Sequence, residues 1–401
     1  MTNRLYYNDS YRVAFDAAVV SCEPHDERFA VVLDQTVFYP TSGGQPFDVG
    51  TLGSAAVVDV IDRQDTIAHV VDRELAVGAT VHGAIDWRRR FDHMQQHTGQ
   101  HVLSAAFERL FAVRTESFHL GATSATIDLG REVTRQQIAA VTEESNRIVW
   151  EDRPVTVRFA SAEEARAMPL RKESIRTGPL RLVEIEEFDL SACGGTHVSH
   201  TGAIGVIAVA SWERLRGGTR VEFLCGGRAL HRFGEWRDAL AATTQRLSVS
   251  PPELAAAIEK LQLEAKTLLK TIRAQQDQLA GHEAGGLVSR AERVGGRLMF
   301  VDAMEGWDAA GLKSLATAAV AIAPAMAVVL FSRAEPPVVV IAAGGDAQVD
   351  ATAVLKTLTA RFGGKGGGKR ELAQGGGFRA PLEQLIEATR AELLNAERAE
   401  R

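Results

Sequence analysis

The sequence predicts a multi-domain α+β protein: a small N-terminal β-barrel, an α+β domain, a long heptad helix and a C-terminal α/β domain. Short β-rich runs separated by turn residues precede Arg88, apolar residues at heptad spacing run from Leu254 to Leu279, and strands alternate with helices after residue 286. These changes of pattern predict four domains, with the boundaries 1–90, 91–230, 231–285 and 286–401.

The composition is that of a soluble globular protein. Of the 401 residues, 45% are hydrophobic and 24% are charged. No apolar run approaches the roughly 20 residues of a membrane span, and the N-terminus has no apolar core of a secretory signal. We therefore expect a cytoplasmic protein with no membrane partner. The odd, low number of cysteines (Cys22, Cys193 and Cys225) argues against a disulfide framework.

Five β-rich runs predict the barrel, or alternatively a small sandwich: 13–22, 28–39, 55–63, 66–73 and 80–86. Residues 38–50, FYPTSGGQPFDVG, are expected to form a hairpin between two strands. Its polar residues are unusual for a tight turn, and its glycines allow backbone N–H groups to approach a substrate closely.

A helix is expected over 92–113, with Asp92 as N-cap and Gln95 in the capping-box position. His97 and His101 would then lie one turn apart on the same face. Strands are expected to follow, with one helix over 131–151, which together suggest an α+β domain.

The long helix is expected to begin at Ser250, with Pro251 in its first turn, and to end at Gly281. Its heptad seam can pack against the preceding helix, 228–247, or against a second copy of the chain. A homodimer through this helix or through the C-terminal domain is therefore an expectation. The C-terminal domain is expected to have strands and helices flanking a glycine-rich segment, and these elements are 296–304, 308–322, 325–333, 336–344, 350–362, 362–378 and 381–400.

Two pairs of metal-ligand residues are the strongest chemical signal in the sequence. His97 and His101 lie in HTGQH, and Cys193 and His197 lie in CGGTH. Three imidazoles and a thiolate suit tetrahedral zinc, so we predict one zinc ion. Thr98 replaces the glutamate of an HExxH metalloprotease. Four protein ligands favour a structural ion, but release of one ligand would open the ion to substrate.

The net charge of −6 does not by itself favour a nucleic-acid partner, but the cationic residues are clustered. Such clusters usually form solvated surface. Because this chain has four of them, binding of a polyanionic partner is an equally good interpretation. The clusters are Arg88–Arg90; Arg171, Lys172, Arg176 and Arg181; Arg214, Arg216 and Arg220; and Lys365, Lys369 and Arg370.

The chain resembles the editing domain of alanyl-tRNA synthetases, and more closely the free-standing alanyl-tRNA editing proteins. Four motifs carry this resemblance in the same order: FYPTSGGQPFDVG, HTGQHVLSAAF, CGGTHVSHTGAIGVI and GTRVEFLCG. GGKGGGKRELAQGGG is similar to the glycine-rich end of the nucleic-acid-binding domain called DHHA1, so the resemblance covers nearly the whole chain.

This resemblance implies a trans-editing hydrolase that deacylates mischarged tRNA(Ala), chiefly Ser-tRNA(Ala), with Gly-tRNA(Ala) as a second candidate. It implies that the four metal-ligand residues bind zinc, that Gln45 lies at the aminoacyl ester and that Thr41 contacts the seryl hydroxyl. The Gly43–Gly44 turn would supply amides to the oxyanion. We expect tRNA contacts at Lys365, Lys369, Arg370 and Arg220. No aminoacylation domain is apparent, so editing is expected in trans.

Two other functions remain to be distinguished. A zinc-stabilised tRNA-binding module without catalysis would bind tRNA and show no turnover. A phosphoesterase would need an aspartate/histidine metal cluster, and the segment after residue 286 contains no histidine. His93 and His200 are interpreted as residues that support the metal ligands or are simply exposed.

Overall fold

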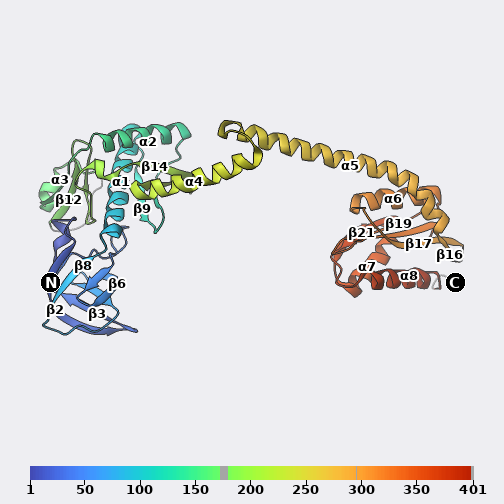
Figure 1. The fold of residues 1–401 in the computed structure, drawn as a ribbon, viewed down its shortest axis with the longest axis horizontal. Helices are drawn as coiled ribbons and strands as arrows, with labels where there is room; N and C mark the ends of the chain where they lie inside the picture. The colour runs from blue at the N-terminus through green and yellow to red at the C-terminus, as the bar shows by residue number, and fades with distance from the viewer. Residues whose placement is uncertain (172–178, 295, 399–401) are drawn as a thin grey trace. The chain divides into compact units, whose positions relative to one another are not determined.

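The computed structural model describes residues 1–171, 179–294 and 296–398, with side chains up to Leu394 (Figure 1). The chain divides into two compact units, Met1–Thr243 and Thr244–Arg401. Each unit has its own hydrophobic core and is described by itself. None of the described helices is both long and apolar enough to cross a lipid bilayer.

The first unit begins with a closed barrel of six strands, in the order β2-β3-β7-β6-β5-β8 (Figure 1). Alternate side chains point inward, and those of Phe15, Val31 and Leu52 are buried in the barrel core. The strands are β2 (Ala14–His25), β3 (Arg28–Leu33), β5 (Gly50–Leu52), β6 (Ala55–Asp62), β7 (Ile67–Val71) and β8 (Thr80–Ile85). The prediction of an N-terminal barrel is confirmed.

The predicted hairpin over residues 38–50 is wrong. This segment joins β4 (Gln35–Thr36) to β5, and the two strands do not pair with each other: β4 pairs with β1 (Asn3–Arg4), and β5 pairs with β6 and β8. The segment does contain a tight turn, in which Ser42 and Gln45 exchange backbone hydrogen bonds of 3.0 and 2.9 Å. The rest of the segment is held by single backbone hydrogen bonds, such as that from the Asp48 amide to the Tyr39 carbonyl at 3.0 Å, and by side chains.

The helix that carries His97 and His101 is α1 (Trp87–Phe111), and it begins earlier than predicted. Asp86 is the N-cap, because its side chain accepts a hydrogen bond of 3.1 Å from the Arg89 amide. Asp92 lies inside the helix, where it pairs with Arg228 at 2.7 Å. Either aspartate could have been the N-cap from the sequence alone, because nothing local shows that Asp92 pairs with the distant Arg228.

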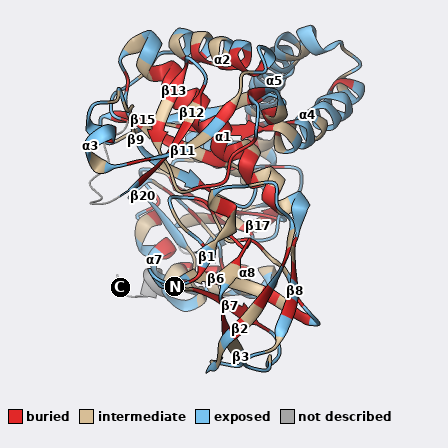
Figure 2. Ribbon diagram, turned by 90° about the vertical axis from the view of Figure 1, so that its left-hand side faces the viewer, coloured by how far each residue is buried: buried red, intermediate tan, exposed pale blue. Residues whose placement is uncertain are grey.

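The rest of the first unit encloses α1. Figure 2 shows the buried residues concentrated in α1 and in β12 and β13. The remaining strands form two antiparallel sheets, β14-β15-β10-β9 and β11-β12-β13. The elements are η1 (Leu5–Tyr7), β9 (Thr115–Leu120), β10 (Ala125–Leu129), α2 (Arg135–Trp150), β11 (Val155–Ala160), α3 (Ala162–Arg166), β12 (Leu180–Ile185), β13 (Asp189–Ala192), η2 (Thr201–Ile204), β14 (Ile207–Leu215), β15 (Gly218–Cys225) and α4 (Gly226–Leu247), whose last residues belong to the second unit.

The second unit is built on a six-stranded mixed sheet, β16-β17-β18-β19-β21-β20. Successive side chains on its strands point to opposite faces of the sheet. On β18, Val328 packs on the face that α6 covers and Val329 on the face that α7 and α8 cover. The elements are η3 (Pro251–Glu253), α5 (Leu254–Arg290), β16 (Glu292–Val294), β17 (Arg297–Met304), α6 (Ala309–Ile322), β18 (Met326–Ser332), β19 (Val338–Ala343), α7 (Ala351–Phe362), β20 (Lys365–Lys369), β21 (Leu372–Gly376) and α8 (Leu382–Arg398).

The heptad helix α5 is longer than predicted. Ser250 and Glu253 form the expected capping box, but the helix continues past Gly281 to Arg290. Ala280 and Ala284 are buried against the α6 side of the sheet, and this packing outweighs the low helix propensity of glycine. Three members of the predicted seam, Leu261, Leu268 and Ile272, are 50%, 62% and 47% exposed, and the homodimer through them stays a prediction.

A buried ion pair fastens α1 to the barrel side of the first unit. Arg90 and Asp48 are both fully buried, and the Arg90 Nε lies 3.1 Å from the Asp48 Oδ2. Arg90 also donates to the carbonyls of Val37 and Ser10, and Asp48 accepts from the Tyr39 amide. Because each charge is both paired and hydrogen-bonded, neither is left uncompensated by burial.

We predict that Asp48→Asn lowers the free energy of unfolding of the first unit by about 3–5 kcal/mol, because it leaves the Arg90 guanidinium buried without a counter-charge. Denaturant unfolding of wild type and variant measures this loss. The control is Glu144→Gln, which removes the partly exposed Arg147–Glu144 pair on α2 and should cost less than about 1 kcal/mol. Equal losses in the two variants would contradict the anchoring role of Asp48.

Candidate metal centre

Four side chains from two distant segments converge in the first unit. The ligand atoms of His97, His101, Cys193 and His197 all lie within 4.8 Å of one another. His97 and His101 are one turn apart on α1, and Cys193 and His197 lie in the loop that follows β13. This group can hold one metal ion, and its three imidazoles and one thiol are the donors that zinc and similar metals prefer.

Each of the three imidazoles is held by a different partner at its Nδ1 atom. The Nδ1 of His97 lies 2.8 Å from the Gln45 Oε1, and that of His101 lies 2.8 Å from the Asp189 Oδ2. The Nδ1 of His197 lies 3.2 Å from the hydroxyl of Thr98. Donation from Nδ1 leaves the Nε2 lone pair for a metal, so the contacts of His97 and His101 with acceptor oxygens select the tautomer that a metal ligand requires, and the Thr98 hydroxyl can accept from His197 in the same tautomer.

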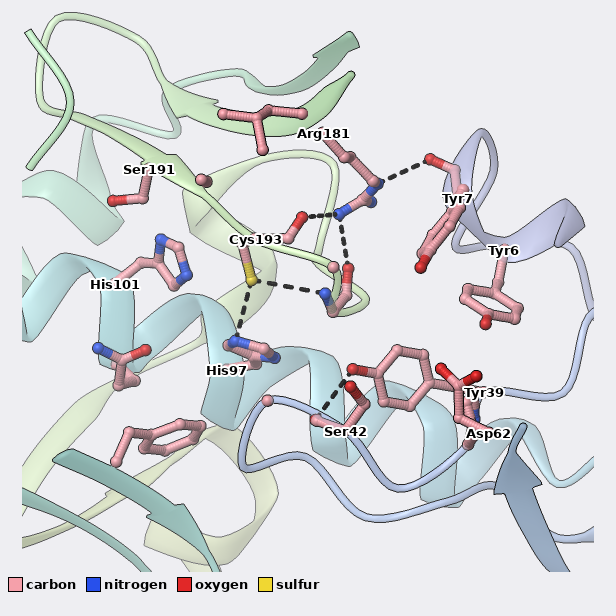
Figure 3. A pocket seen from close by; sticks show the side chains of 18 of the residues that line it. Tyr6, Tyr7, Tyr39, Ser42, Asp62, His97, His101, Arg181, Ser191 and Cys193 are labelled. Atoms are coloured by element: carbon pink, nitrogen blue, oxygen red, sulfur yellow. Dashed lines mark hydrogen bonds between the residues drawn. The ribbon is translucent and has the colours of Figure 1, made fainter. Parts of the chain in front are cut away.

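Cys193 completes the group as an anion. Its Sγ lies 3.4 Å from the Nε2 of His97 (Figure 3). It also lies 3.4 Å from the Nε2 of His197. Burial raises the pKa of the Cys193 thiol, but the facing imidazoles outweigh burial and hold the pKa well below its ordinary value. The thiolate is the form that binds a metal.

The histidine charges are set by burial and by Asp189. Burial lowers the pKa of His197 to about 3, which keeps its ring neutral. Burial also lowers the pKa of His101, but hydrogen bonds to Asp189 and Cys193 outweigh burial and raise it to about 9. In the metal-free state His101 therefore carries a proton at neutral pH, and a metal that binds its Nε2 must displace that proton.

Two glycines within the motifs are required by close packing. A Cβ at Gly195 would lie 2.2 Å from the Cε1 of His97, and a Cβ at Gly99 would lie 2.2 Å from the Sγ of Cys225. Neither position has room for a side chain. Gly195 thus allows the Cys193 loop to approach α1, and Gly99 allows α1 to approach the end of β15.

The structure places Gln45 behind the metal-ligand group. Its side chain is fully buried. Besides accepting from His97, its Oε1 accepts from the Thr196 amide at 3.1 Å, and its Nε2 donates to the Thr196 hydroxyl at 2.8 Å. Gln45 therefore connects the barrel-side segment 37–49 to both metal-binding segments.

A cavity of about 500 Å³ opens beside the metal-ligand group, a volume typical of small-ligand sites. Three of the four ligands line it, namely His97, His101 and Cys193 (Figure 3). Tyrosines from η1 and from segment 37–49, arginines from β1 and β12, and polar residues of α1 and β9 form its other walls. The lining includes Arg4, Tyr6, Tyr7, Tyr39, Gly43, Asp62, Gln100, Thr115, Glu116, Arg171 and Arg181.

The other residues proposed from the glycine-rich turn lie at the edge of this cavity. Its described lining includes Ser42 and Gly43 but neither Thr41 nor Gly44. Thr41 is exposed, and its hydroxyl accepts from the Phe47 amide at 3.2 Å. Gly44 has a φ of +84° and its carbonyl accepts from the Leu120 amide.

The predicted tRNA contacts are distributed over both units. In the first unit, Arg220 on β15 forms an ion pair of 2.7 Å with Asp128. In the second, Lys365, Lys369 and Arg370 are exposed on the hairpin of β20 and β21. Lys172 and Arg176 lie outside the described residues. Among the histidines considered as spares, His93 is buried, and His200 is exposed.

Sequence reasoning missed the residues that hold the imidazoles. Asp189, buried on β13, also accepts from Arg171 at 2.6 Å. Burial raises the Asp189 pKa, but His101 and Arg171 outweigh burial and lower it to about 2, so the carboxylate is ionised. Two local signals were available, since Thr98 lies inside HTGQH and Asp189 lies four positions before Cys193.

Comparisons with known proteins agree with this architecture. Residues 7–89 match the model of class II (A) tRNA synthetases, and residues 180–222 match the second additional domain of threonyl and alanyl tRNA synthetases. Residues 295–395 match the DHHA1 domain. The chain thus belongs to a class of proteins that share three modules with alanyl-tRNA synthetases. These modules contain the barrel, the metal-ligand residues Cys193 and His197, and most of the C-terminal sheet.

Individual relatives narrow this class. The chain is 30% identical over 389 residues to the alanyl-tRNA editing protein AlaX-L of Pyrococcus horikoshii, covering 94% of both chains. It is 34% identical over 303 residues to the mouse alanyl-tRNA editing protein Aarsd1, covering 74% of that relative and 71% of this chain. The chain belongs to the family of alanyl-tRNA editing proteins.

Alanine–tRNA ligases are also related. The chain is 34% identical over 389 residues to the ligase of Pyrococcus furiosus, which covers 93% of this chain. The chain spans only 42% of that ligase. The similarity therefore covers less than half of the length of that ligase.

We predict that Asp189→Asn weakens zinc affinity about 10–100-fold, because a neutral amide holds the His101 ring less well than a carboxylate. Competition with a chelator of known affinity measures the dissociation constant, and circular dichroism checks the fold. Asp128→Asn, which removes the carboxylate paired with Arg220, is the control and should retain zinc like the wild type. Unchanged zinc affinity in Asp189→Asn would show that the His101–Asp189 hydrogen bond does not support the site.

Proposed function

We propose that this chain is a trans-editing hydrolase that cleaves the ester bond of mischarged tRNA(Ala), chiefly Ser-tRNA(Ala), with Gly-tRNA(Ala) as a second substrate. One observation carries the proposal: the metal-ligand group forms a wall of a cavity large enough for an aminoacylated nucleotide end. Membership of the alanyl-tRNA editing family supports the choice of substrate.

Zinc is the metal we propose for His97, His101, Cys193 and His197. The fit rests on the donor set and on the three Nδ1 contacts, which orient the imidazoles before any ion binds. A bound zinc ion would supply Lewis-acid polarisation of a carbonyl oxygen if one ligand yields its place, and would otherwise fix the shape of the cavity wall.

For Gln45 the geometry favours a positioning role over contact with the ester. The Gln45 Oε1 accepts from His97 and from the Thr196 amide, and its Nε2 donates to the Thr196 hydroxyl. We propose that Gln45 holds the His97 ring, whereas Gly43, which lines the cavity, offers backbone to the reacting carbonyl. The free hydroxyl of the terminal ribose is adjacent to the ester on the same sugar, and we propose that it carries the proton.

Recognition of serine requires a polar partner for its hydroxyl. Thr41 remains the candidate from the resemblance, but Gln100 and Thr115 line the cavity and both hydrogen-bond to Ser104. We propose that this pair faces the seryl hydroxyl. Alanine would leave such groups unpaired in a buried site, which favours discrimination against the correctly charged tRNA.

We predict that the zinc-loaded protein deacylates Ser-tRNA(Ala) fastest, Gly-tRNA(Ala) more slowly and Ala-tRNA(Ala) at least about 100-fold more slowly than the seryl substrate. Release of the labelled amino acid measures the three rates side by side. Tight tRNA binding without release of any amino acid would replace the hydrolase with a non-catalytic tRNA-binding module.

The same assay tests Gln45. In Gln45→Ala we expect lower zinc content and at least a tenfold lower rate, partly restored by added zinc. A low rate at full zinc content would instead place Gln45 at the ester, and a wild-type rate would remove it from the mechanism. Gln136→Ala, at an exposed position of α2, is the matched control and should keep the wild-type zinc content and rate.

We also propose that the hairpin of β20 and β21 binds the tRNA backbone. Lys365, Lys369 and Arg370 are exposed there, and Gly367 between the lysines has open space beside it, so its backbone is accessible to a phosphate. Such contacts provide affinity without reading bases, as an editing protein needs when its specificity lies in the aminoacyl pocket.

We predict that reversing these three cations to glutamate weakens tRNA binding and flattens its dependence on salt, by about 0.7–0.9 in the log–log slope for each lost phosphate contact. Filter binding at several salt concentrations measures both effects. The control reverses three exposed cations on α5, namely Lys266, Lys270 and Arg273. If the control variant loses as much affinity, the effect reflects net charge rather than the hairpin.

A further inference from the structure

Arg181 is a buried cation at the cavity with one donor group unused. Its side chain lies on β12 and is 93% buried, since only 7% of the residue is exposed. The Nη1 donates to the carbonyls of Cys193 and Gly195 at 2.7 and 2.9 Å, and the Nε donates to the Tyr7 carbonyl at 2.9 Å (Figure 3). The Nη2 is buried and has no hydrogen-bond partner within residues 1–171, 179–294 and 296–394.

No carboxylate pairs with Arg181 among the residues that the structure describes. The other two arginines of the cavity are paired, Arg4 with Asp62 at 2.7 Å and Arg171 with Asp189 at 2.6 Å. Glu116 also lines the cavity but is exposed. Burial lowers the pKa of Arg181, and the nearby Cys193 thiolate and tyrosines offset only part of this effect. The thiolate belongs to the metal-ligand group, so the side of the Arg181 guanidinium that lines the cavity can still be stabilised by an anionic ligand.

The surroundings of Arg181 suit a nucleotide. Its guanidinium carbon lies 5.7 Å from the centroid of the Tyr7 ring, and that of Arg4 lies 5.6 Å from the same ring. Tyr6 and Tyr39 line the same cavity, and the buried Tyr6 hydroxyl also has no partner in the described part of the chain. Aromatic rings beside a cation are the usual environment of a base and its phosphate in single-stranded nucleic-acid sites.

The chemistry of the substrate decides which group Arg181 binds. In an aminoacyl ester the carboxyl group is esterified and the amino group is cationic, so the phosphates carry all of the negative charge. Guanidinium groups bind phosphate oxygens through strong charge-assisted hydrogen bonds. The nearest phosphate to the ester is the one on the 5′ side of the terminal nucleotide.

We propose that the Arg181 Nη2 binds the 5′-phosphate of the terminal adenosine of the acceptor end, with the ribose and its ester directed toward the metal-ligand group. This inference rests on the proposed function, which supplies the identity of the substrate. Because the Arg181 Nη1 holds the loop of Cys193 and Gly195, one side chain fixes both the phosphate and the wall that faces the ester.

The first test uses the wild-type, zinc-loaded protein and direct binding by NMR titration. Adenosine 5′-monophosphate should bind about tenfold more tightly than adenosine, a difference typical of one charge-assisted hydrogen bond. Equal affinities would overturn the proposal. Inorganic phosphate that competed with the nucleotide at equal concentration would assign the subsite to a free anion and would also overturn it.

The second test compares Arg181 with Arg4, since both guanidinium groups lie beside the Tyr7 ring. Arg181→Gln should reduce the preference for the monophosphate to about twofold or less, while Arg4→Gln, which removes the paired guanidinium, should retain it. Zinc content and circular dichroism show whether Arg181→Gln has kept its site and fold. An undiminished preference in Arg181→Gln, or its loss only in Arg4→Gln, would contradict the assignment.

If Arg181→Gln loses zinc or fails to fold, Arg181→Lys takes its place. A lysine keeps the charge but cannot bind two carbonyls and a phosphate in the geometry of a guanidinium, so the preference should fall at least threefold, and an unchanged preference would overturn the proposal. These binding tests need no turnover. Wild-type protein that binds the monophosphate as expected but never deacylates tRNA would refute the proposed hydrolase and leave the phosphate subsite supported.

Discussion

The first unit depends on one constraint: three imidazole rings must present Nε2 to the same point as a thiolate. Free imidazoles rotate and exchange tautomers, so the constraint is met only if each Nδ1 has a fixed hydrogen-bond partner. The chain supplies three chemically different partners, the amide oxygen of Gln45, the carboxylate of Asp189 and the hydroxyl of Thr98. They come from the barrel-side segment, from β13 and from α1 itself, so the centre requires all three to be in place.

The residues that lie between the ligands in the two short motifs also support the metal-ligand group. Thr98 lies between the α1 histidines and reaches across to His197, while Thr196 lies between the loop ligands and holds Gln45. Gly195 keeps the loop close to the His97 ring. Each motif therefore carries parts that serve the other motif, and neither pair of ligands is oriented by its own segment alone.

How far the sequence predicts this structure depends on the range of the interaction concerned. The barrel strands and the four ligands were predicted from local spacing, because alternation and the i, i+4 relation are local properties. The start of α1 and the continuation of α5 past Gly281 were not, because the Asp92–Arg228 pair and the burial of Ala284 are tertiary. The buried position of Gln45 was missed for the same reason, since its partner Thr196 lies 151 residues away.

The hydrogen bond between Gln45 and His97 has a thermodynamic consequence for the barrel. A metal that binds only the assembled group stabilises every contact needed for assembly, by RT ln(1 + [M]/Kd) for free metal concentration [M]. The docking of segment 37–49 on α1 is such a contact. Metal binding therefore stabilises the attachment of the barrel to α1, and loss of that attachment weakens metal binding. The barrel provides no metal ligand, but its docking contributes to the free energy of metal binding, as does the helix that provides two ligands.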